Sequence, residues 1–193
     1  MIIIRFSPLP LRRIIVLATA MFALSAIICF GQPILLPVKS TPYDRQMQRI
    51  ERILNCSAIS TDRQIPLALV NRWIDDLRAI PYHFSVQWKT PLEVAREAVA
   101  DCKGKAVALY QQLQANGARN LCLVIGKRTP ISGVTHTWVE WTTPAATYVL
   151  DPTINGSARS LAEIPINSYI PYYAYAGTRR YRVANPGILL AGL

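Results

Sequence analysis

The order of the hydrophobic patterns along this chain limits its fold class more than any other feature. Apolar residues recur at helical spacing in the first part, and short runs typical of strands follow from residue 121 onward. Helices first and an antiparallel sheet after them predict the α+β class. The pattern predicts helices over 43–54, 66–80, a short stretch from Pro91 and 101–117, and strands over 121–125, 134–141 and 147–150, with one or two more within 172–183.

Residues 1–31 differ in kind from the rest and are expected to direct export. Three arginines form a basic start, and residues 14–30 follow without a single charge. This is the layout of a secretory signal cleaved before Gln32, and the alternative is an uncleaved membrane anchor. In both cases we expect a domain over 43–193, after an extended linker over 32–42. That domain would be periplasmic, or anchored on the outer side of the inner membrane.

The positive charge of the chain does not by itself point to a particular partner. The formal net charge is +10, and loss of the three N-terminal arginines would lower it to +7. The basic residues are spread along the sequence rather than gathered in one block, which is typical of a solvated surface. No nucleic-acid-binding motif is present. The two histidines lie far apart and no Cys-x-x-Cys pair exists, so we expect no metal site.

Without the N-terminal segment the sequence holds an odd number of cysteines, namely Cys56, Cys102 and Cys122. An odd cysteine in an oxidising compartment indicates a reactive thiol. Cys56 and Cys122 could pair and leave Cys102 free, but spacing alone does not decide this. The apolar run around Cys122 is typical of a buried structural cysteine.

Cys102 stands at the start of the fourth predicted helix. Asp101 before it can accept a hydrogen bond from a free backbone N–H and so cap the helix. The unpaired N–H groups of the first turn favour a thiolate over a thiol, and Lys103 and Lys105 add positive potential. Gly104 leaves space where a substrate acyl group would approach. The alternative is an ordinary buried cysteine near a helix end.

His136 and Asp151 lie on two predicted strands that follow one another. A four-residue hairpin loop after Trp141 would pair Trp141 with Ala146 and set His136 directly opposite Asp151. Cross-strand neighbours have Cβ atoms ~5 Å apart, which suits a carboxylate that accepts a bond from an imidazole. A slip of one residue would put the two on opposite faces. With Cys102, they are the parts of a cysteine nucleophile system.

Four segments carry a resemblance to a known family. Asp-Cys-Lys-Gly-Lys-Ala at 101–106, Thr-His-Thr-Trp-Val at 135–139 and Val-Leu-Asp-Pro-Thr at 149–153 resemble the Cys, His and Asp blocks of the transglutaminase-like superfamily. Residues 88–93 resemble the stretch before the cysteine in its bacterial branch, the transglutaminase-like cysteine proteinases. The resemblance covers roughly residues 65–155. It implies a papain/transglutaminase-like core with the nucleophile at a helix start, packed on an antiparallel sheet.

The resemblance also implies roles for individual residues. Cys102 would form a thioester with the substrate, His136 would act as general base and then acid, and Asp151 would orient the imidazole. The Cys102 backbone N–H would donate to the oxyanion, with a side chain of Gln87 or Trp88 as a second donor. Trp88 is equally typical of a core aromatic.

Three functions compete, of which the first two use these roles. The first is a thiol protease or amidase that acts on a protein or peptide, such as a surface or envelope protein. The second is an acyltransferase that joins a glutamine side chain to an amine. The third is a non-catalytic binding or scaffold domain with the same fold.

Lys103 departs from the family pattern. In the adhesin-cleaving proteases the residue after the cysteine is usually acidic, and an acidic cluster there binds calcium. Here a carboxylate is lost and a positive charge is gained. We therefore expect no calcium requirement and no cofactor.

Overall fold

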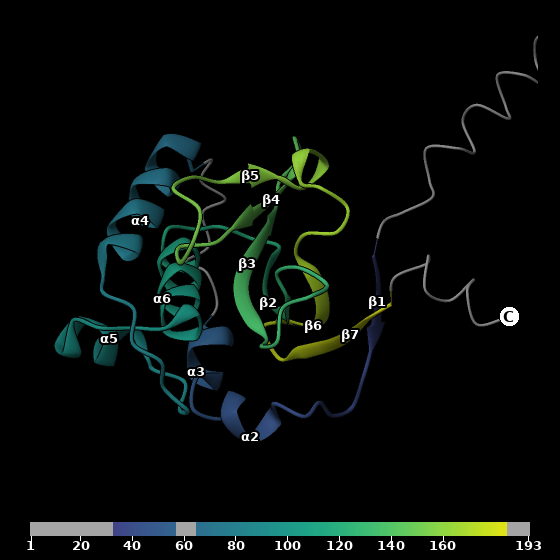
Figure 1. Ribbon diagram of the computed structural model, residues 1–193, viewed down its shortest axis with the longest axis horizontal. Coiled ribbons are helices and arrows are strands. Elements are labelled where there is room, and N and C mark those ends of the chain that lie inside the picture. The colour runs from purple at the N-terminus through teal and green to yellow at the C-terminus, as the bar shows by residue number, and fades with distance from the viewer. Residues whose placement is uncertain (1–32, 57–64, 185–193) are drawn as a thin grey trace, which may run out of the picture. The chain divides into compact units, whose positions relative to one another are not determined.

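The computed structural model describes residues 33–56 and 65–184 (Figure 1). The predicted signal or anchor over residues 1–31 lies outside these described residues. Among the helices of the described ranges, none is both long enough and apolar enough to cross a membrane. Residues Leu35–Val183 belong to one compact unit, which contains the helices and the sheet described below.

The helices come before the central strands, as predicted. Their bounds are α2 (Asp44–Met47), α3 (Glu51–Leu54), α4 (Leu67–Ala79), α5 (Pro91–Glu97) and α6 (Cys102–Ala115). The single helix expected over 43–54 is two short helices, because Arg49 and Ile50 donate to the carbonyls of Gln46 and Met47 in tight turns between them. Ile50 is nonetheless fully buried, as the helical spacing of apolar residues had indicated.

Local signals in the sequence account for the ends of α5 and α6. Thr90 and Glu93 form a capping box at the start of α5, with Pro91 in its first turn. The Asp101 side chain accepts from the backbone N–H of Gly104 and caps α6. Beyond the end of α6, Gly117 adopts φ 94°, the left-handed conformation for which glycine is suited.

The strands form one sheet of seven in the order β1-β7-β6-β2-β3-β4-β5. Their bounds are β1 (Ile34–Pro37), β2 (Leu121–Lys127), β3 (His136–Thr142), β4 (Thr147–Leu150), β5 (Arg159–Ser160), β6 (Ile170–Ala176) and β7 (Arg179–Ala184). The strands predicted at 121–125, 134–141 and 147–150 are confirmed as β2, β3 and β4. The segment 172–183 supplies β6 and β7. The sequence did not predict β5, nor β1 within the segment expected as a linker.

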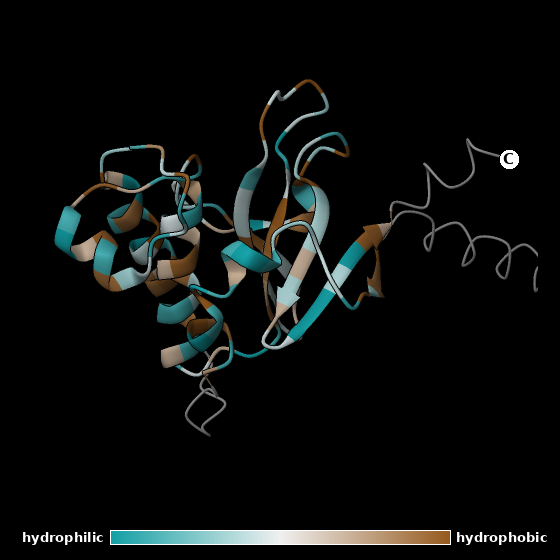
Figure 2. Ribbon diagram, turned by 90° about the horizontal axis from the view of Figure 1, so that it is seen from below, coloured by the Kyte–Doolittle hydropathy of each residue, from teal (hydrophilic) through white to brown (hydrophobic). Residues whose placement is uncertain are grey.

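The two faces of the sheet pack against different partners. Leu123, Val139 and Leu150 face the helices and join the main hydrophobic core with residues of α4 and α6. Val124 and Trp138, one position away, belong to a second cluster on the opposite face. Figure 1 shows α4 and α6 beside the sheet, and Figure 2 shows hydrophobic residues on both the helices and the central strands.

The register between β3 and β4 differs from the predicted one by two residues. Trp141 pairs with Tyr148, not with Ala146, because the loop runs from Thr143, whose N–H donates to the Ala146 carbonyl. Continuing this register sets Asp151 opposite Trp138 rather than opposite His136. A shift of two keeps every side chain on its predicted face, so His136 and Asp151 still share one face as diagonal neighbours.

Gly126 adapts the sheet beside His136, its partner across β2 and β3. A Cβ atom at this glycine would lie 2.1 Å from the Ile170 carbonyl oxygen and 2.8 Å from a ring carbon of Trp138. The pairing of β2 with β6 also shifts register at this point. Any side chain here would therefore push β6 or Trp138 away.

Candidate active site

The thiol side of the site is built around the start of α6. Cys102 is the first residue of this helix and is 6% exposed. Asp101, which has no exposed surface, accepts from Gly104 N through Oδ1 and from Ser85 N through Oδ2, both over 3.1 Å. Its Oδ2 also receives the ammonium of Lys103. The carboxylate next to Cys102 is therefore fully occupied in holding the helix start and the preceding loop.

The two lysines after Cys102 differ in their surroundings. The Lys103 ammonium lies on Asp101 and 4.8 Å from the centre of the Phe84 ring. Lys105 is 2% exposed, and its Nζ donates to the carbonyl oxygens of Arg78 and Ile80 over 3.2 and 2.6 Å. Burial lowers the pKa of Lys105, and the Asp151 charge opposes this. Lys105 thus ties α6 to the end of α4 from inside the protein.

Gly104 serves packing rather than substrate approach, which corrects the sequence interpretation. A Cβ atom at this position would lie 3.1 Å from Val94 Cγ2 and 3.3 Å from Ala100 Cβ. Both neighbours belong to the protein, on α5 and on the segment before α6. The glycine allows α6 to approach these residues closely.

The imidazole side of the site joins β3 to the end of β4. His136 Nε2 lies 2.8 Å from Asp151 Oδ2. The side chain of His136 is 12% exposed and that of Asp151 is fully buried. Trp138 stacks near the imidazole, with ring centres 6.2 Å apart and planes at 21°. The bond through Nε2 leaves Nδ1 as the ring nitrogen available to Cys102.

The electrostatics of His136 couple it to both partners. Burial alone lowers the pKa of His136, but the hydrogen bond with Asp151 and the negative charges of Asp151 and Cys102 outweigh it. The net result raises the pKa from 6.5 to about 9. An imidazole that keeps its proton at neutral pH, beside a thiol and a carboxylate, is the arrangement that stabilises a thiolate.

Asp151 is held by more groups than the sequence indicated. Its Oδ1 accepts from Thr153 N over 2.9 Å, and its Oδ2 accepts from the Tyr169 hydroxyl over 2.9 Å. Burial raises the pKa of Asp151, but the hydrogen bonds and the charge of His136 lower it by more. The net pKa is below its usual value, so the carboxyl stays ionised. Asn155 donates in turn to the Tyr169 hydroxyl over 2.8 Å. Neither Tyr169 nor Asn155 belongs to a motif that would have pointed to this role.

Trp88 and Gln87, the two residues predicted as further oxyanion donors, differ in their exposure to solvent. Trp88 is 3% exposed and packs in the main core, which is the core-aromatic interpretation of this residue. Gln87 is exposed on the loop before it. The Cys102 backbone N–H lies in the first turn of α6, where such groups have no partner within the helix. The oxyanion site, with the Cys102 backbone N–H and a side chain of Gln87 or Trp88 as donors, stays a prediction.

Among the cysteines that the structure describes, none pairs with another. Cys56 is exposed, Cys122 is partly buried and Cys102 is buried, and all three are free thiols. Burial raises the pKa of Cys122 to about 11, with Glu140 across the strand adding to the effect. Within residues 33–56 and 65–184, no group of three or more His, Cys, Asp and Glu side chains is arranged to hold a metal ion.

A thiol at a helix start, packed on an antiparallel sheet that carries an imidazole and a carboxylate, defines a papain/transglutaminase-like α+β fold. The chain is similar in structure to Legionella pneumophila LapG. The calcium-bound LapG structure matches with a TM-score of 0.53 and 14% identity over 74% of this chain and 81% of LapG. A second LapG structure gives 0.54 and 13% over 78% and 85%, and an EGTA-treated one gives 0.53 and 13% over 78% and 86%.

The similarity to LapG is seen in the structure and not in comparisons of the sequence. No protein-family model and no curated protein matches the chain. At 13–14% identity the LapG structures establish the fold and not the activity. The predicted fold class is confirmed, and the chemistry has to be argued from the residues of this chain.

Proposed function

We propose that the protein is a thiol hydrolase, a protease or amidase, that cleaves an amide bond through a thioester on Cys102. The observation that carries the proposal is the position of His136, hydrogen-bonded to Asp151 Oδ2 over 2.8 Å and coupled to Cys102, with its pKa raised to about 9. Nucleophile, base and orienting group are thus connected in the order that this chemistry needs.

Acylation would begin with the Cys102 thiolate and a protonated His136. The sulfur attacks the carbonyl carbon of the substrate, and the carbonyl oxygen takes the negative charge. The Cys102 backbone N–H, with Gln87 as a second donor, stabilises this oxyanion. When the C–N bond breaks, His136 Nδ1 gives its proton to the leaving amine, and a thioester on Cys102 remains.

Deacylation would use the same groups in the opposite direction. His136, now neutral, accepts a proton from a water molecule that attacks the thioester carbonyl. The C–S bond breaks, the carboxylic acid leaves, and Cys102 returns as a thiolate beside a protonated imidazole. Asp151 stays ionised throughout and holds the imidazole through Nε2.

The cellular setting is part of the proposal. The basic and apolar N-terminal segment supports export, with residues 1–31 as a signal or anchor and 43–193 as the catalytic domain. The substrate would then be a protein or peptide of the cell envelope, and the proposed chemistry needs neither a nucleic acid nor a cofactor.

The first experiment measures iodoacetamide labelling of each cysteine by peptide mass spectrometry from about pH 4 to 9. Cys56, which is exposed, and Cys122, with its pKa raised to about 11, are reference thiols within the same chain. We expect Cys102 to label fastest well below pH 8 despite its burial. In His136→Ala this advantage should disappear.

A second experiment identifies the acyl acceptor. The protein and its Cys102→Ala variant are incubated with a peptide mixture containing glutamine, with and without a primary amine. New peptide ends that require Cys102 support hydrolysis. Amine incorporation would support the acyltransferase instead. Ordinary labelling of Cys102, together with a biological effect that Cys102→Ala retains, would point to a scaffold domain.

A further inference from the structure

Tyr169 is hydrogen-bonded to Asp151, although it takes no part in the bond changes of the proposed reaction. It lies directly before β6 and is 5% exposed. Its hydroxyl donates to Asp151 Oδ2 over 2.9 Å and accepts from Asn155 Nδ2 over 2.8 Å. The side chain therefore extends the chain of hydrogen bonds from His136 through Asp151 to Asn155, which is partly buried.

The chain of hydrogen bonds has a direction. The amide nitrogen of Asn155 can only donate, so the Tyr169 oxygen accepts from it and its own proton is left for Asp151. Burial and the Asp151 charge raise the pKa of Tyr169, and the hydroxyl remains a donor at neutral pH. Asp151 Oδ2 thus receives two donors, from Tyr169 and His136, while Oδ1 receives the Thr153 N–H.

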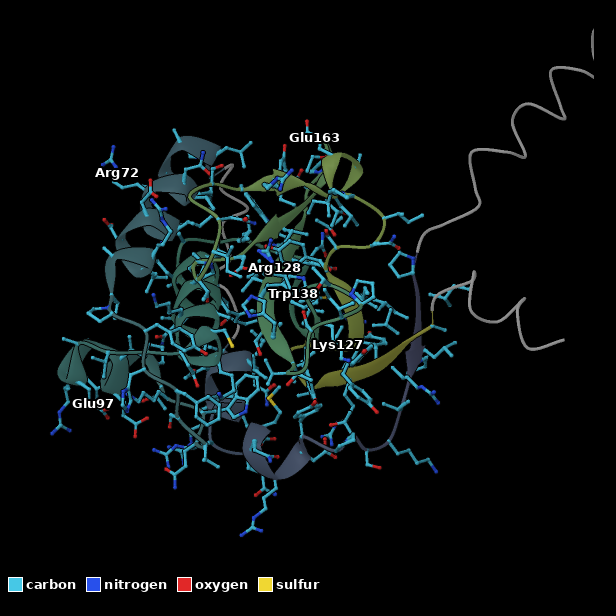
Figure 3. The ribbon with its side chains drawn as sticks, viewed as in Figure 1. Arg72, Glu97, Lys127, Arg128, Trp138 and Glu163 are labelled. Atoms are coloured by element: carbon cyan, nitrogen blue, oxygen red, sulfur yellow. The ribbon has the colours of Figure 1, made fainter. Side chains whose placement is uncertain are left out.

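The ring of Tyr169 is also held in place. Trp138 packs against it edge-on, with ring centres 5.2 Å apart and planes at 72°. The Arg128 guanidinium lies over the ring at 5.6 Å from its centre, and the Arg128 carbonyl accepts the Tyr169 N–H over 2.9 Å. Figure 3 labels both Trp138 and Arg128, which lie in the sheet region of the molecule.

The backbone of Tyr169 is in a conformation that tyrosine rarely adopts. Its φ is 53°, in the left-handed region. Such a conformation is costly and persists only where the surrounding structure requires it, often at functional sites. Here it turns the chain from the preceding loop into β6 at the position whose side chain reaches Asp151.

We propose that Tyr169 is a positioning residue that fixes the rotation of the Asp151 carboxylate, so that Oδ2 faces His136 Nε2. This role rests on the proposed thiol chemistry. Without Tyr169, His136 would be the one side chain bonded to Oδ2, so the position of this oxygen would depend on the imidazole that it orients. With Tyr169 as a second donor, Oδ2 is held independently of His136, and the imidazole is kept in one orientation toward Cys102.

The test uses Tyr169→Phe, which removes the hydroxyl and keeps the ring on Trp138. The sequence has only two histidines, so the His136 imidazole can be titrated by NMR and assigned with His136→Ala. We expect the pKa of His136 to fall by about one, a tenfold change in its protonation equilibrium. Cys102 labelling at neutral pH should slow by about tenfold. Where a substrate is known, kcat should fall with KM unchanged.

Tyr175→Phe is the matched control. Tyr175 is 3% exposed, and its hydroxyl bonds to Thr41 rather than to the site. This variant should lose stability as a buried hydroxyl is lost but leave the titration of His136 and the labelling of Cys102 unchanged. Asn155→Leu, which frees the direction of the Tyr169 proton, should lower the pKa of His136 by less than Tyr169→Phe does.

The outcomes separate this role from the proposed function. An unchanged or higher pKa of His136 in Tyr169→Phe, with wild-type labelling of Cys102, overturns the positioning role and assigns Tyr169 to packing alone. Ordinary titration of His136 and ordinary labelling of Cys102 in the wild-type protein would overturn the proposed function, and the positioning role with it. The charged groups that act on the pKa of His136 are Cys102 and Asp151. Lys105 in turn interacts with the charge of Asp151, and Arg128 interacts with Tyr169.

Discussion

Two aspartates, Asp101 at a helix start and Asp151 at a strand end, have buried carboxylates that are stabilised by different partners. Asp101 and Asp151 both have no exposed surface, and each accepts three hydrogen bonds. A buried carboxylate without such partners would be strongly unfavourable. The cost of burial is offset by donors in both places, so burial alone does not indicate which aspartate takes part in chemistry.

The difference lies in the third donor of each carboxylate. Asp101 is bound by the Lys103 side chain together with two backbone N–H groups. Asp151 is bound by His136, a group that gives up and regains a proton in the proposed reaction. The first arrangement holds a helix in place, and the second can transmit a change of protonation to Cys102.

The largest effect should come from Asp151→Asn. The amide has one oxygen where the carboxylate has two, so it can accept from Thr153 N or from the Tyr169 hydroxyl but not from both. It has nearly the same shape as the carboxylate but cannot stabilise a protonated His136, so the protein should fold while the thiolate is lost. We expect Cys102 labelling at neutral pH, and any hydrolysis, to fall by roughly 10³-fold or more. Circular dichroism checks the fold. Labelling at the wild-type rate would remove Asp151 from the proposed site.

Asp101→Ala should act mainly on stability. It removes the cap of α6 and leaves Lys103 and the Ser85 N–H without their partner, for a loss of about 2–3 kcal/mol in the free energy of unfolding. Urea unfolding measures this. Asp101→Asn, which can still cap the helix, should lose less. If Asp101→Ala instead abolished labelling of Cys102 without a loss of stability, the two aspartates would share a catalytic role.

The pH dependence of stability should reveal the raised pKa of His136. The pKa of His136 is raised from 6.5 to about 9 in the folded protein, so the folded state binds its proton more tightly than the unfolded state. The resulting stability is fully present below pH 6.5 and is lost as pH rises through about 9. Urea unfolding at several pH values should show this decline in the wild type and a shallower one in His136→Gln. Parallel pH curves for the two proteins would contradict the raised pKa.

The smallest effect should come from chelation. The Lys103 ammonium already occupies the carboxylate beside Cys102, and a divalent cation would have to displace it. EGTA should therefore leave Cys102 labelling and hydrolysis unchanged. Both would fall with EGTA if calcium ordered the loop around Ser85. Activity that disappears with EGTA and returns with added calcium would show that Lys103 does not replace a cation.

Several elements follow from local sequence signals alone. The Thr90–Glu93 capping box, the Asp101 cap and Gly117 place the ends of α5 and α6, because capping depends on residues within one helical turn. The alternation of β3 and β4 puts His136 and Asp151 on one face, and the two-residue error in the register left that result intact. A hairpin register depends on one or two loop hydrogen bonds, and the sequence is less informative about these.

The sequence by itself determined the α+β order, the thiol at a helix start and the shared face of His136 and Asp151. Only the tertiary structure decided that Trp88 belongs to the core, that Lys105 binds the end of α4, and that Tyr169 and Asn155 support Asp151. The physical reason is the range of the interactions. Periodicity and capping act between neighbours along the chain, whereas these contacts join segments that become adjacent only when the helices pack on the sheet.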